Sequence, residues 1–244
     1  MPKLLAVLAH PDDESLGIGA TLAKCAAGGA ELSLVTATRG DAGRYRGHRP
    51  GTAPHPGREA LAKIREAELR AAADVLGIRD LTLFDYPDGH LDGADPRELI
   101  DRIAAEIRRI RPDVVVTFGP DGAYGHPDHL AISQFATAAT VAAASGSDAH
   151  AASKLYYIAW PRSTWAAYQE AFKQLTSMVD GVERQATPWP EWSITTEIDT
   201  REFAATAWRA ITCHDSQVAG YERLQALPEA HRHAIFSRQS YYRV

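Results

Sequence analysis

Short apolar runs alternate with amphipathic stretches over the first 144 residues. The apolar runs, bounded by turn residues, predict buried strands at Lys3–Leu8, Glu31–Thr36, Leu81–Phe84 and Asp113–Phe118. Apolar positions at three- and four-residue spacings predict helices at Ser15–Ala27, Arg58–Leu76, Pro96–Ile110 and about Asp128–Ala144. Strands that alternate with helices favour an α/β fold, with a mostly parallel sheet and helices on both of its faces.

The pattern is weaker in the C-terminal third, which we expect to be less regular. It predicts strands at Lys154–Ile158 and Ser193–Ile198 and a helix at Glu202–Cys213. Arg39–Gly57 is rich in Gly and Pro and has no periodicity, so it predicts a long loop of the kind that is often functional. We find no repeat or linker and expect a single domain over residues 1–244.

Composition excludes several classes of protein. Lys and Arg total 26 against 31 Asp and Glu, so the net charge of −5 predicts no nucleic-acid partner. The early apolar run Leu4–Ala9 has six residues, too few for a signal-peptide core or a membrane anchor. Two cysteines, Cys25 and Cys213, give no disulfide framework. We therefore expect a cytoplasmic protein, and a homo-oligomer is compatible with the sequence.

Two similar motifs follow the first and fourth predicted strands. Each has the form His-Pro-Asp followed by a further potential metal ligand: Asp13 after His10, and His129 after His126. If a helix begins at each proline, the two ligands of a motif lie one turn apart and can bind a common ion. Strands one and four usually flank the point where strand order reverses, so both motifs would meet in one crevice. One His-Pro-Asp is typical of a helix start, but two at strand ends predict a metal site.

The segments AHPDDE at 9–14 and HPDH at 126–129 resemble the signature motifs of the LmbE-like or PIG-L family of zinc-dependent N-deacetylases. The similarity extends to TRGD at 38–41, REAE at 65–68, YPDG at 86–89 and HDSQ at 214–217. The resemblance implies a Rossmann-like fold. It also implies a zinc ion held by His10, Asp13 and His129. The same three donors can hold ferrous iron, because ligand type alone does not separate the two metals.

The resemblance also implies roles for residues beside the metal. Asp12 matches the general base, which takes a proton from the zinc-bound water that acts as nucleophile. His126 matches a residue that, when protonated, stabilises the oxyanion or protonates the leaving amine. Tyr124 matches a mobile tyrosine that polarises the substrate carbonyl. Asp128 is expected to orient or charge His126.

Arg65 and Asp88 match positions that bind sugar hydroxyls in family members that act on N-acetylglucosamine. An exposed ion pair and a plain turn are the competing interpretations of these two residues. The implied reaction is hydrolysis of an acetamide on a small-molecule amino sugar, giving acetate and a free amine. Another amide hydrolase of the same family and a ferrous oxygenase using the same His/Asp/His site remain alternatives. A sugar-binding protein without activity is a further alternative. Asp12 argues against the oxygenase, which needs no base beside the metal, and Asp12 with His126, as an acid–base pair, argues against the binder.

Residues outside the two histidine motifs carry weaker signals. Glu14 is expected to support the start of the first helix, and His214 and Gln217 either close the site or end a helix. A group of arginines in and beside the predicted loop hints at an anionic or hydroxyl-rich aglycone: Arg39, Arg44, Arg46, Arg49 and Arg58. A solvated run of charges explains these arginines nearly as well.

Overall fold

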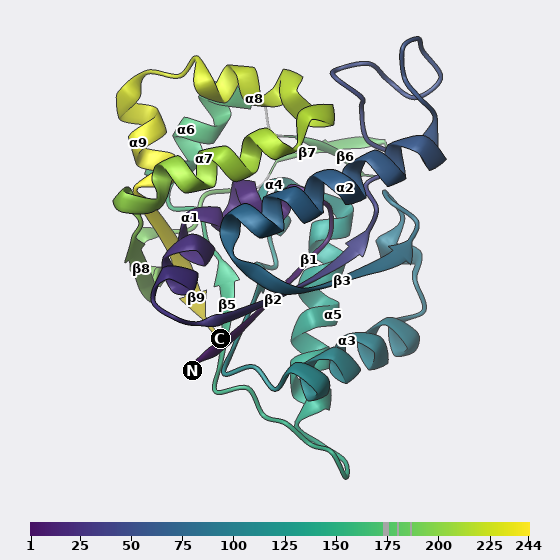
Figure 1. The fold of residues 1–244 in the computed structure, drawn as a ribbon, viewed down its shortest axis with the longest axis vertical. Coiled ribbons are helices and arrows are strands. Elements are labelled where there is room, and N and C mark those ends of the chain that lie inside the picture. Colours follow the sequence, from purple (N-terminus) through teal and green to yellow (C-terminus); the bar gives the residue numbers. More distant parts are fainter. Residues whose placement is uncertain (173–175, 180, 186) are drawn as a thin grey trace.

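The computed structural model describes residues 1–172, 176–179, 181–185 and 187–244. Over these residues, the main sheet has the strand order β3-β2-β1-β4-β5-β9-β8 (Figure 1). Its strands are β1 (Lys3–Leu8), β2 (Glu31–Thr38), β3 (Ile78–Tyr86), β4 (Val114–Phe118), β5 (Lys154–Ile158), β8 (Thr196–Asp199) and β9 (Arg238–Arg243). β1 to β5 are parallel, whereas β9 is antiparallel to β5 and β8. The expected α/β fold with a mostly parallel sheet is confirmed.

Helices cover both faces of this sheet (Figure 1). One face carries α1 (Asp13–Ala27), α2 (Arg58–Leu76) and α7 (Ala204–Cys213), which pack on one another. The other carries α3 (Pro96–Ile110) and α5 (Pro127–Ala143). The start of α3 is fixed by the carboxylate of Asp95, which accepts the backbone N–H of Arg97 at 2.8 Å. Leu99, Ile103 and Ile107 of α3 are fully buried, as their spacing predicts.

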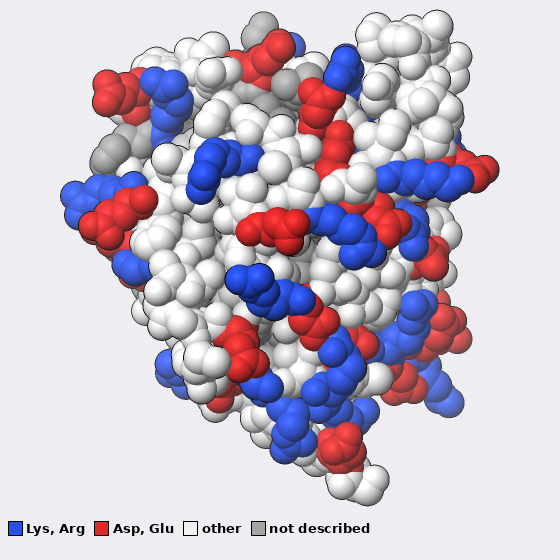
Figure 2. All heavy atoms as spheres, in the orientation of Figure 1, with Lys and Arg blue, Asp and Glu red and all other residues white. Residues whose placement is uncertain are grey.

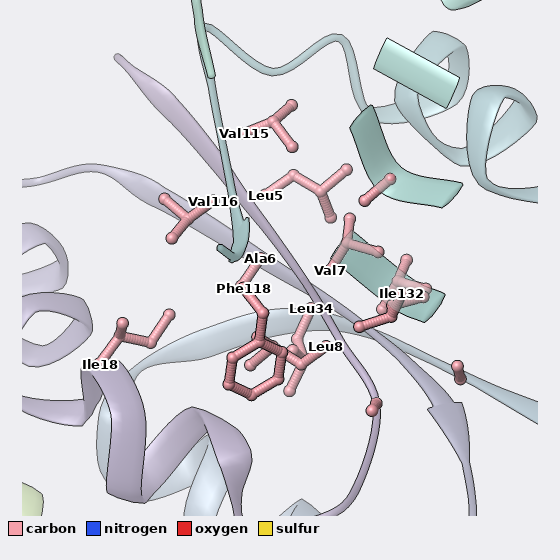
Figure 3. Close-up of a cluster of buried hydrophobic side chains, with 14 of the residues drawn as sticks. Leu5, Ala6, Val7, Leu8, Ile18, Leu34, Val115, Val116, Phe118 and Ile132 are labelled. Atoms are coloured by element: carbon pink, nitrogen blue, oxygen red, sulfur yellow. The ribbon is translucent and has the colours of Figure 1, made fainter. Parts of the chain in front are cut away.

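The central strand β1 is buried on both sides. Leu5 and Val7 point toward the face that carries Ile132 of α5, whereas Val116 of the neighbouring β4 points to the face of Ile18 in α1 (Figure 3). Burial of each such side chain contributes about 1.5–3 kcal/mol. The end of β1 is therefore a rigid support for the residues that follow it.

The strand order reverses between β1 and β4. From β1 the chain continues to β2 and β3 on one side of the sheet, and from β4 it continues to β5 on the other. Leu4 pairs with Val114 and Ala6 with Val116, so the carboxyl ends of the two strands lie side by side. In open α/β sheets this is the place where ligands bind. The expected meeting point of the two histidine motifs is confirmed.

The two motifs start their helices differently. Pro127 is the first residue of α5, as expected. The condition of a helix start at the proline is not met at Pro11, because α1 begins at Asp13, two residues before the predicted Ser15. Asp12 has a φ of 106°, in the left-handed region, and its carbonyl accepts the first helical N–H groups, those of Ser15 and Leu16. The chain therefore turns sharply at Asp12 instead of entering a helix at the proline.

The C-terminal third consists of short elements, several of which no pattern predicted. These are α6 (Arg162–Phe172), the hairpin β6 (Ser177–Val179) and β7 (Val182–Arg184), α8 (Val218–Gln225) and α9 (Glu229–Phe236). The predicted strand at Ser193–Ile198 is displaced, because Glu191–Ser193 forms a 3-10 turn and β8 starts at Thr196. Ala20 of α1 joins a second apolar cluster with residues of α6, α7, α8 and α9. These helices therefore pack over the start of α1, next to the first motif.

The predicted loop between β2 and α2 is confirmed, since residues 39–57 form no helix and no named strand. On the face drawn in Figure 2, acidic and basic side chains are interspersed. Within the described part of the chain, no helix combines the length and the apolar character needed to cross a bilayer.

Candidate functional site

Two histidines and an aspartate meet where the strand order reverses. His10 and Asp13 follow β1, and His129 lies in the first turn of α5. His10 Nδ1 is 3.2 Å from His129 Nε2, and His129 Nε2 is 3.3 Å from Asp13 Oδ1. Asp13 Oδ2 is 3.7 Å from His10 Nδ1. All three residues are buried. The spacings are close to the separation of about 3.3 Å between ligands bound to a tetrahedral zinc at 2.0–2.1 Å.

The outer nitrogens of both imidazoles are held by protein acceptors. His10 Nε2 donates to Asp128 Oδ2 at 3.0 Å and lies 3.1 Å from Asp88 Oδ1. His129 Nδ1 donates to the carbonyl of Gly122 at 3.2 Å. Carboxylates and carbonyls behind ligating histidines orient the ring and make its other nitrogen a better ligand. The two nitrogens left over, His10 Nδ1 and His129 Nε2, are those that face each other.

The buried carboxylates around His10 need a positive charge to balance them. Burial alone would lower the pKa of His10, but the hydrogen bonds to Asp128 and Asp88 raise it to about 10. Burial would raise the pKa of Asp13, but the charges of His129 and His10 hold it well below its usual range. A proton on His10 therefore balances the buried carboxylates. A divalent cation bound between the same atoms would displace that proton.

The donor set fits a catalytic zinc or ferrous site. Two imidazoles and one carboxylate leave coordination positions open for water and substrate, as catalytic sites require. His126 is an alternative third ligand, because donor atoms of His10, His126 and His129 all lie within 4.8 Å of one another. Asp13 is the better candidate, since its two oxygens face both of the other ligands. It also brings the negative charge that a divalent ion needs.

Asp12 lies beside these ligands in a restrained conformation. Its Oδ2 accepts a hydrogen bond from Arg65 Nη2 at 2.9 Å, and its backbone N–H donates to Glu14 Oε2 at 3.0 Å. Burial raises the pKa of Asp12, although the charge of Arg65 acts in the opposite direction. A carboxylate with a raised pKa is better suited to accept a proton from water than an ordinary aspartate.

His126 and Tyr124 lie in the segment that contains α4 (Gly122–Gly125). His126 Nδ1 accepts the backbone N–H of Asp128 at 3.2 Å, so the proton of a neutral ring is on Nε2. Burial and the neighbouring His129 and His10 lower the pKa of His126 to about 3. The structure thus favours a neutral ring rather than the expected protonated one. Burial raises the pKa of Tyr124, so its hydroxyl keeps its proton and remains a donor.

Asp128 contacts the ring of His126 through its backbone N–H, whereas its carboxylate faces His10. Its carboxylate accepts hydrogen bonds from His10 Nε2 and from the backbone N–H groups of Gly89 at 2.7 Å and Leu91 at 2.9 Å. The reason is the register of α5. With Pro127 as the first helical residue, Asp128 points back at β1, whereas His126 stays outside the helix.

Arg65 and Asp88 are neither exposed nor simple turn residues. The side chain of Arg65 is 5% exposed and donates to the carbonyl of Gly40 as well as to Asp12. That of Asp88 is 8% exposed, faces His10, and accepts the N–H of Ala42 at 2.8 Å. Both residues are thus bound within the site, on the side of the 39–57 loop.

The loop arginines are largely engaged in ion pairs. Arg39 pairs with Glu66 and Asp85, Arg46 with Asp215, and Arg58 with Asp41. The hint of an anionic aglycone is correspondingly weaker, because an arginine already paired with a carboxylate binds a second anion less readily.

A cavity of about 220 Å³ opens beside the candidate metal ligands. Asp12, Asp13, Tyr124 and His129 are among its lining residues. Other lining residues come from α1, β4, α4 and the region of α6: Leu16, Gly17, Phe118, Ala123, Trp160 and Tyr168. No sequence pattern predicted the contribution of the α6 region, because the 150–195 stretch carries no motif and its position depends on tertiary packing.

Comparisons with known proteins agree with this geometry. The family model for PIG-L, described as GlcNAc-PI de-N-acetylase, matches residues 5–140. A 1D-myo-inositol 2-acetamido-2-deoxy-alpha-D-glucopyranoside deacetylase of Kineococcus radiotolerans is 33% identical over 88% of this chain and 69% of its own. The namesake from Streptomyces avermitilis is 35% identical over 88% of this chain and 83% of its own.

Solved structures share the fold at lower identity. The N,N'-diacetylchitobiose deacetylase of Pyrococcus horikoshii superposes with a TM-score of 0.70 at 18% identity, over 99% of this chain and 83% of its own. The 4-carboxy-2-hydroxymuconate hydratase of Pseudomonas putida KT2440 superposes with a TM-score of 0.71 at 21% identity, over 100% of this chain and 96% of its own. A deacetylase and a hydratase on one fold show that the fold alone does not decide the reaction. The family model and the sequence relatives do decide the family, and the chain belongs to the PIG-L family.

Proposed function

We propose that the protein is a metal-dependent hydrolase that removes the N-acetyl group from an N-acetylglucosamine-type sugar, giving acetate and a free amine. The observation that carries this proposal is the 3.2 Å approach of His10 Nδ1 to His129 Nε2 beside the carboxylate of Asp13. Together these residues would hold zinc or ferrous iron. The names of the relatives, which are deacetylases of acetamido sugars, support the same substrate class.

A bound cation at this site would polarise the acetamide carbonyl and lower the pKa of a water molecule. Asp12 would accept the proton of that water, since it lines the cavity and its pKa is raised by burial. Arg65 keeps the Asp12 carboxylate in place through the 2.9 Å hydrogen bond. Asp12 can then deliver the proton to the leaving amine when the C–N bond breaks.

Two neutral donors would stabilise the oxyanion of the tetrahedral intermediate. His126 keeps a proton on Nε2 because its Nδ1 is an acceptor, and Tyr124 keeps its hydroxyl proton. Fixed donors in a site with little water stabilise developing negative charge strongly, often by about 2.7–4 kcal/mol per donor. We place the sugar on the side of Arg65, Asp88 and the 39–57 loop, where polar groups are concentrated.

The test is release of primary amine from a panel of N-acetylglucosaminyl compounds. The protein is stripped with a chelator and reloaded with Zn²⁺ or Fe²⁺, each under anaerobic conditions and in air. We expect turnover to require metal but not oxygen. An Asp12→Asn variant should lose about 10²–10⁴-fold in kcat, whereas Asp74→Asn, on the exposed side of α2, should retain wild-type activity. Metal-loaded protein that releases no amine from any compound would refute the acetylglucosamine assignment, and oxygen consumption would favour an oxygenase.

A further inference from the structure

The cavity beside the candidate metal ligands has two chemically different ends. Asp12, Asp13 and His129 mark the polar end. Phe118 stacks on His129 with 3.9 Å between ring centroids, and the rest of the lining is mainly apolar: Leu16, Gly17, Trp160 and Tyr168. The Trp160 ring stacks on Tyr168 with 4.2 Å between centroids and 7° between planes. The reacting centre therefore opens directly into an aromatic and aliphatic space.

This space is larger than an acetyl group requires. A methyl group occupies about the volume of one water molecule, about 30 Å³, and an apolar cavity of about 150 Å³ is enough to bind benzene. The cavity here has a volume of about 220 Å³. An acetyl group would leave most of the apolar end in contact with water rather than with substrate.

The polarity of the walls argues against a sugar ring at the apolar end. The hydroxyl of Tyr168 already donates to the carbonyl of Leu16. The described residues that line the cavity do not include Arg65, which contacts Asp12, or Asp88, which contacts His10. Several sugar hydroxyls would lose water there without gaining partners, and each unpaired hydroxyl is costly. An alkyl chain has no such groups to satisfy.

We propose that the apolar end of this cavity binds the acyl group of the substrate and accepts linear acyl chains longer than acetyl, from butanoyl to hexanoyl. This inference rests on the proposed amide hydrolysis, in which one water is consumed, the C–N bond breaks, and a carboxylate and a free amine are released. The sugar then points toward Arg65 and Asp88, and the acyl chain points toward Trp160 and Leu16.

The first experiment measures amine release from N-acetyl-, N-butanoyl- and N-hexanoylglucosamine by zinc-loaded protein. We expect kcat/KM to rise by about fourfold per added methylene until the cavity is full, since each CH₂ leaves water for an apolar wall. A parallel pair, the methyl and benzyl glycosides of N-acetylglucosamine, tests whether the apolar end takes the aglycone instead.

The second experiment changes the size of the cavity. A Cβ added at Gly17 would meet only Ile158 Cδ1, at 3.5 Å, an ordinary contact, so a larger side chain there can extend into the cavity. Gly17→Leu should lower the ratio of hexanoyl to acetyl kcat/KM at least tenfold, and Gly17→Ala should lower it less. Leu16→Ala enlarges the space and should shift the preference to longer chains. Gly93→Leu adds the same side chain at an exposed position with nothing within 4 Å, and should change no ratio.

The outcomes separate this inference from the proposed function. If no amide of any chain length is cleaved, the proposed hydrolysis fails. If N-acetylglucosamine is cleaved but longer chains are rejected, the hydrolysis stands and the acyl assignment is refuted. The assignment is also refuted if the benzyl aglycone raises kcat/KM and Gly17→Leu removes this increase without changing the ratio of hexanoyl to acetyl kcat/KM. Thermal unfolding of the three cavity variants shows whether each is folded. If Gly17→Leu does not fold, Leu16→Ala tests the acyl assignment in its place.

Discussion

Asp128 provides the sharpest test of which atoms bind the metal. Its Oδ2 accepts two hydrogen bonds, from His10 Nε2 at 3.0 Å and from Gly89 N at 2.7 Å, and its Oδ1 accepts one from Leu91 N at 2.9 Å. The carboxylate is fully buried. It thus fixes the proton of His10 on Nε2 and leaves Nδ1 to face Asp13.

The variant Asp128→Asn offers one oxygen where the native residue offers two. If its NH₂ group takes the place of Oδ1, it opposes the N–H of Leu91. If it takes the place of Oδ2, it opposes Gly89 and drives the proton of His10 to Nδ1, the nitrogen that we assign to the metal. Each arrangement leaves a buried donor unpaired, at a cost of about 1–3 kcal/mol in stability. Loss of such a support lowers metal affinity by about 10–100-fold, or about 1.4–2.7 kcal/mol.

The assay is competition for Zn²⁺ against a chromophoric chelator at constant pH, for the wild type, Asp128→Asn and the exposed control Asp92→Asn. Asp88→Asn is the informative companion, because Asp88 Oδ1 is also 3.1 Å from His10 Nε2. We expect Asp92→Asn to match the wild type and the two buried variants to lose affinity, with Asp128→Asn the weaker binder. A folded Asp128→Asn protein with wild-type zinc affinity would refute the role of the Asp128 carboxylate in supporting His10 as a ligand.

Three further changes test other parts of the argument. His214→Phe removes the partner of the fully buried Glu14 carboxylate, 2.7 Å away, and should lower the free energy of unfolding by about 3–5 kcal/mol. Denaturant titration measures this change, and a loss of less than about 1 kcal/mol would contradict the buried pair. Arg65→Lys cannot make both the contact with the Gly40 carbonyl and that with Asp12, so kcat should fall by about 10–100-fold while the zinc content stays the same. An unchanged kcat would mean that Arg65 does not position Asp12. Ile103→Ala, in the core of α3, should cost about 2–5 kcal/mol in stability but leave kcat as it is, which thermal melts and initial rates will check.

The N-terminal half of the fold could be predicted because its signals are local. Pro96–Ile110 is a helix in the sequence pattern and in the structure, since its apolar spacing, its Asp95 cap and its burial all favour the same conformation. β1 and β4 are apolar on both faces, as buried parallel strands are. These locally predictable strands also allowed the prediction that the first and fourth strands lie side by side near the site.

The site was predictable in its residue types but not in its hydrogen bonds. The register of α5 and the turn after β3 decide which carboxylate accepts the hydrogen bond of His10 Nε2. Neither is encoded in the HPDH motif alone. The hydrogen bond between the Asp128 carboxylate and His10 was therefore not foreseen from the motif. In the same way, Trp160 lines the cavity only because β5 and α6 pack beside α1, and no pattern in the 150–195 stretch signals that contact.

The C-terminal third, whose sequence pattern is the weakest, contacts the candidate catalytic base Asp12 through Glu14. Asp12 holds a φ of 106°, a conformation that costs a residue other than glycine about 1–3 kcal/mol and persists only where neighbours enforce it. Glu14 binds its backbone N–H, and Glu14 is in turn bound by His214, at the end of α7. Burial alone would lower the pKa of His214, but the charge of Glu14 raises it, so the pair is strongly held. The C-terminal third therefore does more than line the cavity: through the buried pair of Glu14 and His214 it holds the backbone of Asp12 beside the candidate metal ligands.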